Sequence, residues 1–322
     1  MNAPPLPGLA DIEAAAREIE AVVPPTPQYS WPLLNERAGA EVWVKHENHT
    51  PIGSFKIRGA FWHLGRLVRE RPDLPGFIAA TRGNFGQAVA WAAGRLKRPA
   101  VIVVPHGNSR EKNAAMRALG AELVEHGADF QAALEHASAL AAQRGLRFVD
   151  SFHRDLAWGH AVSMLRFFRE TPPLERLYVP IGLGSGICGA MAARDALGLP
   201  TRIIGVAAAR APAIALSFAE RRLITHPATT ELADGMACST PHPEALAHML
   251  RGVERIVTVD EEEIAAAIRA FFTDTHNVAE GAAAGALAAL LKEKAGLAGR
   301  RVGVVLSGGN VDREVFARVL AG

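Results

Sequence analysis

The sequence of 322 residues has little cysteine, few aromatic side chains and no excess of either charge. Its two cysteines, Cys188 and Cys238, cannot build a disulfide framework, and without a Cys-x-x-Cys pair nothing indicates a zinc site. Both are expected to be small buried thiols in a reducing cytosol. A formal net charge of +2 lacks the basic excess that nucleic-acid binding needs.

Signals for membrane insertion and for secretion are missing as well. No apolar run approaches the ~18 residues of a membrane-spanning helix. Residues 1–7 have neither the basic nor the apolar region of a signal peptide. The sequence therefore predicts a cytoplasmic globular protein of one large or two medium domains, with a small molecule as its partner and no nucleic acid or membrane.

Short apolar runs alternate with longer alanine-rich amphipathic segments along most of the chain. Apolar runs without polar alternation are typical of parallel strands that helices cover on both faces. The pattern predicts an α/β fold with two open parallel sheets. Strands are expected at 41–45, 77–80, 100–104, 122–124, 177–181, 202–206, 255–259 and 301–306, and helices at 9–22, 54–69, 84–97, 109–119, 128–144, 186–198, 260–274 and 280–295.

A lysine, Lys56, stands at the junction between the first of these strands and the following helix. Lysine is strongly hydrated, so Lys56 taken alone is explained by a solvated helix position. Open α/β sheets, however, bind ligands in the loops that follow strands. The role of Lys56 therefore depends on three other loops of this kind.

The first loop, residues 81–87, reads Thr-Arg-Gly-Asn-Phe-Gly-Gln and follows strand 77–80. Its hydroxyl, two glycines and two amides at a helix N-terminus suit a carboxylate, although a plain helix cap explains such a stretch equally well.

The third loop in sequence order is Ser307-Gly308-Gly309-Asn310, which directly follows the last strand. Its serine could hydrogen-bond a ring nitrogen, and an ordinary Gly-Gly turn is the alternative.

The second loop, residues 182–189, opens a helix with the sequence Gly-Leu-Gly-Ser-Gly-Ile-Cys-Gly. A glycine-rich backbone at a helix N-terminus is a phosphate cradle. The loop also spells the dinucleotide fingerprint G-x-G-x-x-G, which would indicate an NAD-binding oxidoreductase. That class needs an acidic residue about 20 positions further on, and residues 199–209 contain none. A phosphate such as that of a mononucleotide-sized cofactor fits better.

Together these segments resemble the serine/threonine dehydratase and serine racemase family of fold-type II pyridoxal-phosphate (PLP) enzymes, from about residue 20 to the end. The segment 54–59, Ser-Phe-Lys-Ile-Arg-Gly, resembles the Schiff-base lysine segment of that family. Loops 81–84 and 180–189 look closer to those of phenylserine dehydratases. Further matches are Val104-Pro105 followed by Lys112, and residues 117–123, 232–237 and 280–285.

The resemblance implies a fold like that of the tryptophan synthase β chain, with two open twisted parallel-sheet domains and helices on both faces. We expect residues 1–75 and 154–322 to form a large PLP-binding domain and residues 76–153 a small mobile domain. The family also suggests a homodimer. Because the chain ends soon after the Ser307 loop, no C-terminal regulatory domain is expected.

The resemblance further implies PLP as the cofactor, with Lys56 as its Schiff-base residue and as the base at Cα. Ser307 and Glu280 are expected to be catalytic too, although a helix N-terminal acid explains Glu280 equally well. The expected cofactor contacts are Phe55, Lys56, Asn84, Gly182, Leu183, Gly184, Ser185, Gly186 and Ser307, and the expected substrate contacts are Thr81, Arg82, Gly83, Asn84 and Phe85.

The sequence departs from the family at four places, and three of them bear on the expected chemistry. Arg82 replaces a serine that is an acid/base in racemases, and an arginine with a pKa above ~12 is a poor proton shuttle. Phe85 replaces a histidine, which makes this wall of the site more apolar. Residues 206–212 lack the carboxylates of the family's divalent-metal site, so no metal is expected. Residues 159–162, Gly-His-Ala-Val, replace a Gly-Gln-Gly-Thr run and have no functional explanation.

The sequence therefore predicts a PLP-dependent ammonia-lyase that converts a 3-hydroxy amino acid to a 2-oxo acid and ammonia. A hydroxyl at the ring nitrogen favours β-elimination over transamination. Serine, threonine or an aromatic analogue such as phenylserine is the expected substrate. The alternatives are 3-hydroxyaspartate, whose second carboxylate would pair with Arg82, and a cofactor-free binding protein of the same fold.

Overall fold

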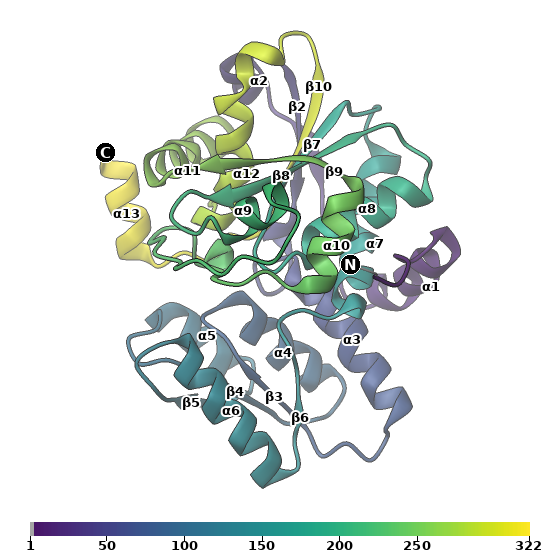
Figure 1. Ribbon diagram of the computed structural model, residues 1–322, viewed down its shortest axis with the longest axis vertical. Coiled ribbons are helices and arrows are strands. Elements are labelled where there is room, and N and C mark those ends of the chain that lie inside the picture. The colour runs from purple at the N-terminus through teal and green to yellow at the C-terminus, as the bar shows by residue number, and fades with distance from the viewer. Residues whose placement is uncertain (1–2) are drawn as a thin grey trace.

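The computed structural model, which describes residues 3–322, contains two sheets, one above the other in Figure 1. The larger has the strand order β1-β2-β10-β7-β8-β9 and the smaller the order β5-β4-β3-β6. All neighbouring strands are parallel except β1 and β2. The strands are β1 (Gln28–Ser30), β2 (Glu41–His46), β3 (Phe77–Ala80), β4 (Ala100–Val104), β5 (Glu122–Glu125), β6 (Arg147–Phe148), β7 (Arg176–Pro180), β8 (Arg202–Ala208), β9 (Val253–Val259) and β10 (Arg301–Leu306).

Helices cover both faces of each sheet, as the unbroken apolar strands predicted (Figure 1). They are α1 (Leu9–Glu20), α2 (Pro32–Ala38), α3 (Lys56–Glu70), α4 (Asn84–Arg95), α5 (Arg110–Ala118), α6 (Phe130–Arg144), α7 (Arg154–Glu170), α8 (Ser185–Ala196), α9 (Ala213–Ala219), α10 (Pro243–Gly252), α11 (Glu261–Thr275), α12 (Gly281–Lys292) and α13 (Arg313–Ala321), with short 3-10 turns η1 (Glu47–His49), η2 (Asp234–Met236) and η3 (Lys294–Gly296).

The smaller sheet shows why its strands are apolar throughout. Every residue of β3 and β4 is buried, and alternate residues enter two different cores. Ile78 and Val101 pack with α6 on one face, whereas Ala79 and Ile102 join the larger core that includes α4. Period-two alternation therefore separates two buried faces here, instead of a buried and a solvated one.

The larger sheet is likewise packed between two helical layers. Val42, Val302 and Ile204 lie in a core with α11 and α12. Leu177 and Ile203 lie in the opposite core with α7 and α8. The carboxyl ends of β2, β7 and β10 thus meet at one edge of a sheet that is covered on both sides, which is where a ligand site is expected.

The chain leaves the larger sheet through α3 and returns through α7, and these two helices pack against each other. All four strands of the smaller sheet lie between residues 77 and 148. The domain boundaries 1–75 with 154–322 and 76–153, and the mobility of the smaller part, stay predictions. Within the described part of the chain, every helix is too short or too polar to span a membrane.

The sequence pattern missed several elements, of which α7 is the longest. Twelve of its seventeen residues are buried, so it lacks the polar face from which an amphipathic helix is recognised. It also begins at a histidine cap, His153, instead of the usual Ser, Thr, Asp or Asn. The antiparallel edge strand β1 was missed as well, because three residues carry too little pattern.

Candidate active site

Lys56 is the first residue of α3 and is held against the loop that follows β10. Ser54 and Gly308 form an isolated antiparallel bridge, and the backbone N–H of Phe55 donates to the carbonyl of Ser307 at 3.0 Å. Main-chain bonds therefore join two segments that lie about as far apart in the sequence as the chain allows. The prediction that Lys56 and Ser307 share a site agrees with this arrangement.

Asn84 and Glu280 meet at the same place. The Asn84 amide nitrogen donates to Glu280 Oε1 at 2.6 Å, and Asn310 donates to Asn84 Oδ1 at 2.8 Å. The Glu280 backbone N–H donates to the carbonyl of Gly308 at 3.1 Å. Asn84 and Glu280 are both buried. The site thus joins the first turn of α4, the start of α12 and the end of β10.

The three glycine positions of the loop at the start of α8 have little room for a side chain. Gly184 caps α8 with a φ of +105°, a conformation that favours glycine. A Cβ on Gly182 would lie 2.4 Å from the carbonyl oxygen of Gly235, and one on Gly186 would lie 3.1 Å from the Phe55 ring. Because the first N–H groups of a helix have no partner within it, this bare backbone suits a phosphate.

Replacing Gly182 by alanine is therefore expected to weaken the retention of a phosphate-bearing cofactor at least about tenfold, or ~1.4 kcal/mol. The new methyl group would overlap the Gly235 carbonyl, which as backbone cannot rotate away. The ratio of bound cofactor to protein after gel filtration measures the effect. Gly296→Ala is the matched control, since its Cβ would meet no atom within 4 Å. Full retention in Gly182→Ala would contradict the proposed cradle.

The electrostatics of the site favour a neutral lysine. Burial lowers the pKa of Lys56, and the charge of Lys112 lowers it further against the opposing effect of Glu280. Burial also raises the pKa of Glu280. A lysine acts as nucleophile or base only when its amine is neutral. Cys238 lies near Lys56, but burial raises the pKa of its thiol to about 11, so it is a poor nucleophile.

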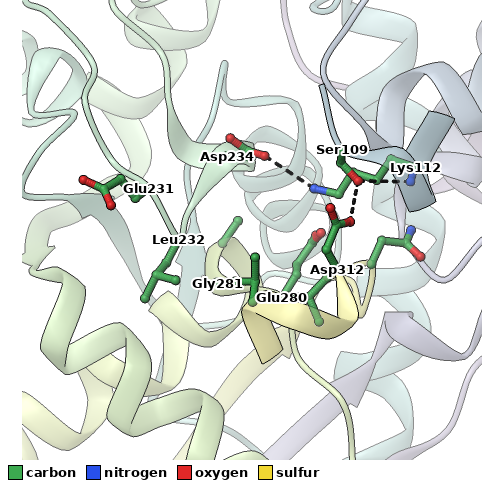
Figure 2. Close-up of a pocket in the computed structure, with 13 residues that line it drawn as sticks. Ser109, Lys112, Glu231, Leu232, Asp234, Glu280, Gly281 and Asp312 are labelled. Carbon is green, nitrogen blue, oxygen red and sulfur yellow. Dashed lines mark hydrogen bonds and ion pairs between the residues drawn. The ribbon is translucent and has the colours of Figure 1, made fainter. Parts of the chain in front are cut away.

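Arg82 belongs to an ion cluster at the border between the two sheets. Arg82 Nη2 and Lys112 Nζ each lie 3.6 Å from a carboxylate oxygen of Asp234. The Arg82 side chain is 50% exposed and that of Lys112 only 11%. Figure 2 shows Lys112 and Asp234 facing a pocket that Glu280 also lines. Arg82 does not line this pocket itself, but its half-exposed guanidinium reaches the pocket residue Asp234.

Some residues that were predicted to contact substrate or cofactor do not line the pocket shown in Figure 2. Phe85 is buried in the main hydrophobic core, so its aromatic ring packs inside the protein at this position of α4. The Thr81 hydroxyl accepts the N–H of Gly83 at 3.1 Å and so stabilises its own loop. Leu183 is half-buried and packs against the same core as Phe85.

Two residues of the candidate site were not among the predicted site residues. Asn310 binds Asn84, and Asp234 pairs with Lys112 and Arg82. The signal for Asn310 was an amide directly after the Gly-Gly turn, and that for Asp234 was its place in the family match at 232–237. Neither sequence signal shows what Asn310 or Asp234 contacts, because both side chains bind residues from distant segments of the chain.

A buried ion cluster lies behind Lys56. Glu47 and Arg58, both almost fully buried, form an ion pair of 2.9 Å, and the Ser163 hydroxyl donates to Glu47 at 2.6 Å. Although burial raises the pKa of Glu47, Arg58 and Lys45 outweigh it and lower it to about 2. Arg58 follows Lys56 by two residues on α3, so this cluster fixes the first turn of the helix that carries the lysine.

Comparison with known proteins identifies the chain. Residues 19–308 match the model of a family described as pyridoxal-phosphate dependent enzyme. The chain belongs to this family. The predicted cofactor, PLP, and the predicted α/β fold with parallel sheets are thereby confirmed.

Individual relatives in this family narrow the class. The chain is 34% identical to an L-threonine ammonia-lyase of Thermotoga maritima, over 97% of this chain and 78% of the relative. It is 30% identical to an L-threo-3-hydroxyaspartate ammonia-lyase of Saccharomyces cerevisiae, over 98% and 97%. The solved structure of threonine deaminase isoform 2 from Solanum lycopersicum matches with a TM-score of 0.89 and 28% identity, over 100% and 97%. The predicted class, a PLP-dependent ammonia-lyase of the serine/threonine dehydratase group, is confirmed.

Proposed function

We propose that the protein removes water from a 3-hydroxy amino acid, by loss of the α-proton and the β-hydroxyl, and that water then hydrolyses the released 2-imino acid to a 2-oxo acid and ammonia. The observation that carries this proposal is the buried Lys56 amine, whose pKa burial lowers, held by backbone bonds beside Ser307. A lowered pKa increases the share of the amine in its neutral form, which is the form that acts as nucleophile and as base.

The residues present fit PLP. The backbone N–H groups of residues 182–186 would hold its phosphate, since the glycines at 182, 184 and 186 keep the chain close-packed and free of side chains at these positions. Asn84 would bind the phenolic oxygen and Ser307 the ring nitrogen, with Phe55 against the ring. When bound, PLP supplies an electron sink for the bond that breaks at Cα.

The protein's own groups then move the protons. The neutral Lys56 amine removes the α-proton of the substrate. Glu280 accepts the Asn84 amide at Oε1, which leaves its second oxygen to carry a proton at its raised pKa. Burial of Glu280 and Ser307 keeps water away from these groups, which strengthens their interactions.

Threonine or serine is the first candidate substrate, supported by the likeness to L-threonine ammonia-lyases. The ion cluster favours a second candidate, 3-hydroxyaspartate. Arg82 and Lys112 share the single carboxylate of Asp234, and Arg82 has no nearer carboxylate of its own among the described residues. A second substrate carboxylate would give the half-exposed Arg82 guanidinium such a partner. Phenylserine stays a third candidate on the likeness of loops 81–84 and 180–189 to those of phenylserine dehydratases.

A substrate panel tests the proposal. Serine, threonine, phenylserine and L-threo-3-hydroxyaspartate are each mixed with the holoenzyme, and the release of 2-oxo acid and of ammonia is measured. We expect equal amounts of both products from at least one of the four. A protein that binds PLP but releases neither product from any of them would overturn the ammonia-lyase assignment and favour a binding protein.

Arg82→Ala separates the two leading substrates. If the arginine binds a second carboxylate, kcat/KM for 3-hydroxyaspartate falls about 10- to 100-fold, the range for a lost charge-assisted hydrogen bond of ~1.5–3 kcal/mol. The value for threonine changes little. Arg117→Ala, which removes a surface pair with Glu125, is the control. An equal loss with both substrates would mean that Arg82 only supports the fold of its loop.

We further propose that the protein works in the cytoplasm as a homodimer, on its likeness to the family. Light scattering after size-exclusion chromatography would measure the mass in solution. A mass of one chain of 34.3 kDa would rule the dimer out.

A further inference from the structure

A second group of metal-ligating side chains lies outside the active site. His63 stands in α3, His153 caps α7, and Asp155 lies in the first turn of α7. These are the two places where the chain leaves the larger sheet and returns to it. The reaction proposed above uses none of the three, and Lys56 lies two turns away at the start of α3.

Two of the three distances between the ligand atoms are those expected around one ion. His63 Nδ1 lies 3.2 Å and His153 Nδ1 3.4 Å from the same oxygen, Oδ2 of Asp155. All three atoms lie within 4.8 Å of one another. Around a tetrahedral ion with ligands at about 2.0–2.1 Å, neighbouring ligand atoms are about 3.3–3.4 Å apart. Small adjustments would therefore let the three atoms share one ion.

We propose that His63, His153 and Asp155 bind one divalent transition-metal ion of the Zn²⁺ type, with water completing the coordination. Two imidazoles and a carboxylate are a set that Zn²⁺ and its neighbours in the series accept. The His153 side chain is 42% exposed and gives the ion a route from solvent, while the other two ligands are buried.

Existing contacts compete with the ion and set its affinity. Arg66 donates to Asp155 Oδ1 at 2.9 Å, and the Asp155 backbone N–H donates to His153 Nδ1 at 3.2 Å. An ion at Oδ2 would leave Oδ1 to Arg66, an outer contact that orients the carboxylate. Arg66 also has Glu70 at 3.6 Å as another partner. Since the cap of α7 must be given up, we expect micromolar rather than tighter binding.

The position of the site gives the ion a defined effect. It would link α3 to the start of α7, and so join the two segments that connect the sheets. An added link of this kind stabilises the native state only. We therefore expect a melting temperature that rises with the metal concentration and saturates at one ion per chain.

Cobalt provides a direct probe. The holoenzyme is freed of metal with a chelator and titrated with Co²⁺ alone, whose tetrahedral d–d bands lie at longer wavelength than the cofactor band. We expect intense bands that saturate at one equivalent and disappear when Zn²⁺ is added. The affinity should fall at least about tenfold, or ~1.4 kcal/mol, in His63→Ala and in His153→Ser. Serine keeps a cap for α7 but removes the imidazole.

The chain offers a matched control. His126 and His136 stack, as His63 and His153 do, with ring centroids 3.8 and 4.2 Å apart. Within residues 3–322, however, no carboxylate completes a three-ligand group with His126 and His136. His126→Ala should therefore keep full Co²⁺ binding. The proposal is overturned if His153→Ser, with an unchanged melting temperature in the absence of metal, binds Co²⁺ as the unaltered protein does. It is equally overturned if His126→Ala alone removes binding, or if one equivalent of Co²⁺ gives only the weak bands of an octahedral ion.

Discussion

Lys56→Ala is expected to remove the visible absorption of the bound cofactor and to lower kcat by about 10²- to 10⁴-fold or more, the range for loss of a positioned general base. The loss should lie at the upper end, because the same amine is also the attachment point of the cofactor. Its neighbours cannot replace it: Cys238 is a poor nucleophile at neutral pH and Glu280 already binds Asn84.

Two further variants show that the effect belongs to the amine. Lys56→Arg keeps a positive charge but cannot become a neutral base, so it should be as inactive as alanine. Lys294→Ala, at an exposed position of η3, should retain colour and turnover. A visible spectrum and a continuous assay of 2-oxo acid release measure both properties. Colour and activity that survive in Lys56→Ala would move the attachment point to another residue.

Glu47→Gln should have the largest effect on stability. The change leaves the Arg58 guanidinium buried without its carboxylate partner, and breaking such a pair costs about 3–5 kcal/mol. Arg58 keeps only its bonds to the backbone carbonyls of Val23 and Pro24. The midpoint of denaturant unfolding, followed by circular dichroism, measures the loss. Glu125→Gln, which removes a surface pair, should cost no more than ~1 kcal/mol.

The pH dependence and a double variant distinguish charge from packing. Because the pKa of Glu47 is lowered from 4.5 to about 2 in the folded protein, its contribution is complete above pH 4.5. It is lost as the pH falls towards 2. Glu47→Gln should therefore remove part of the acid sensitivity. Replacing Glu47 and Arg58 together by Leu and Met should cost less than Glu47→Gln alone, and a larger cost would show that shape, not charge, dominates.

Much of the fold could be predicted because its strands are buried on both faces. Each of the eight predicted strands has a counterpart in the structure, from β2 to β10. Since ligand sites of such sheets lie after the strands, the loops at 81–87, 182–186 and 307–310 could be selected before any contact was known. That Asn84 meets Glu280 and that Ser307 meets Phe55 agrees with this selection.

The missed features depend on contacts that a local pattern does not contain. The Glu47–Arg58 pair joins η1 to α3, and its contribution to stability depends on its complete burial. Phe85 was expected at the substrate because it stands in the right loop. As the second residue of α4, it packs in the core, and its contact with the substrate stays a prediction. A motif selects the loop, but the direction of each side chain follows from how the helix packs.

The place of β10 in the larger sheet has a consequence for biosynthesis. β10 inserts between β2 and β7, and Arg301 pairs with Glu41. While the chain is still being translated, β2 and β7 each lack this neighbour, and residue 54 lacks its partner at 308. Pairings of such sequence separation form slowly, and unpaired strand edges attract other chains. We therefore expect the nascent chain to expose these strand edges until β10 is synthesised, and to complete its cofactor site only afterwards.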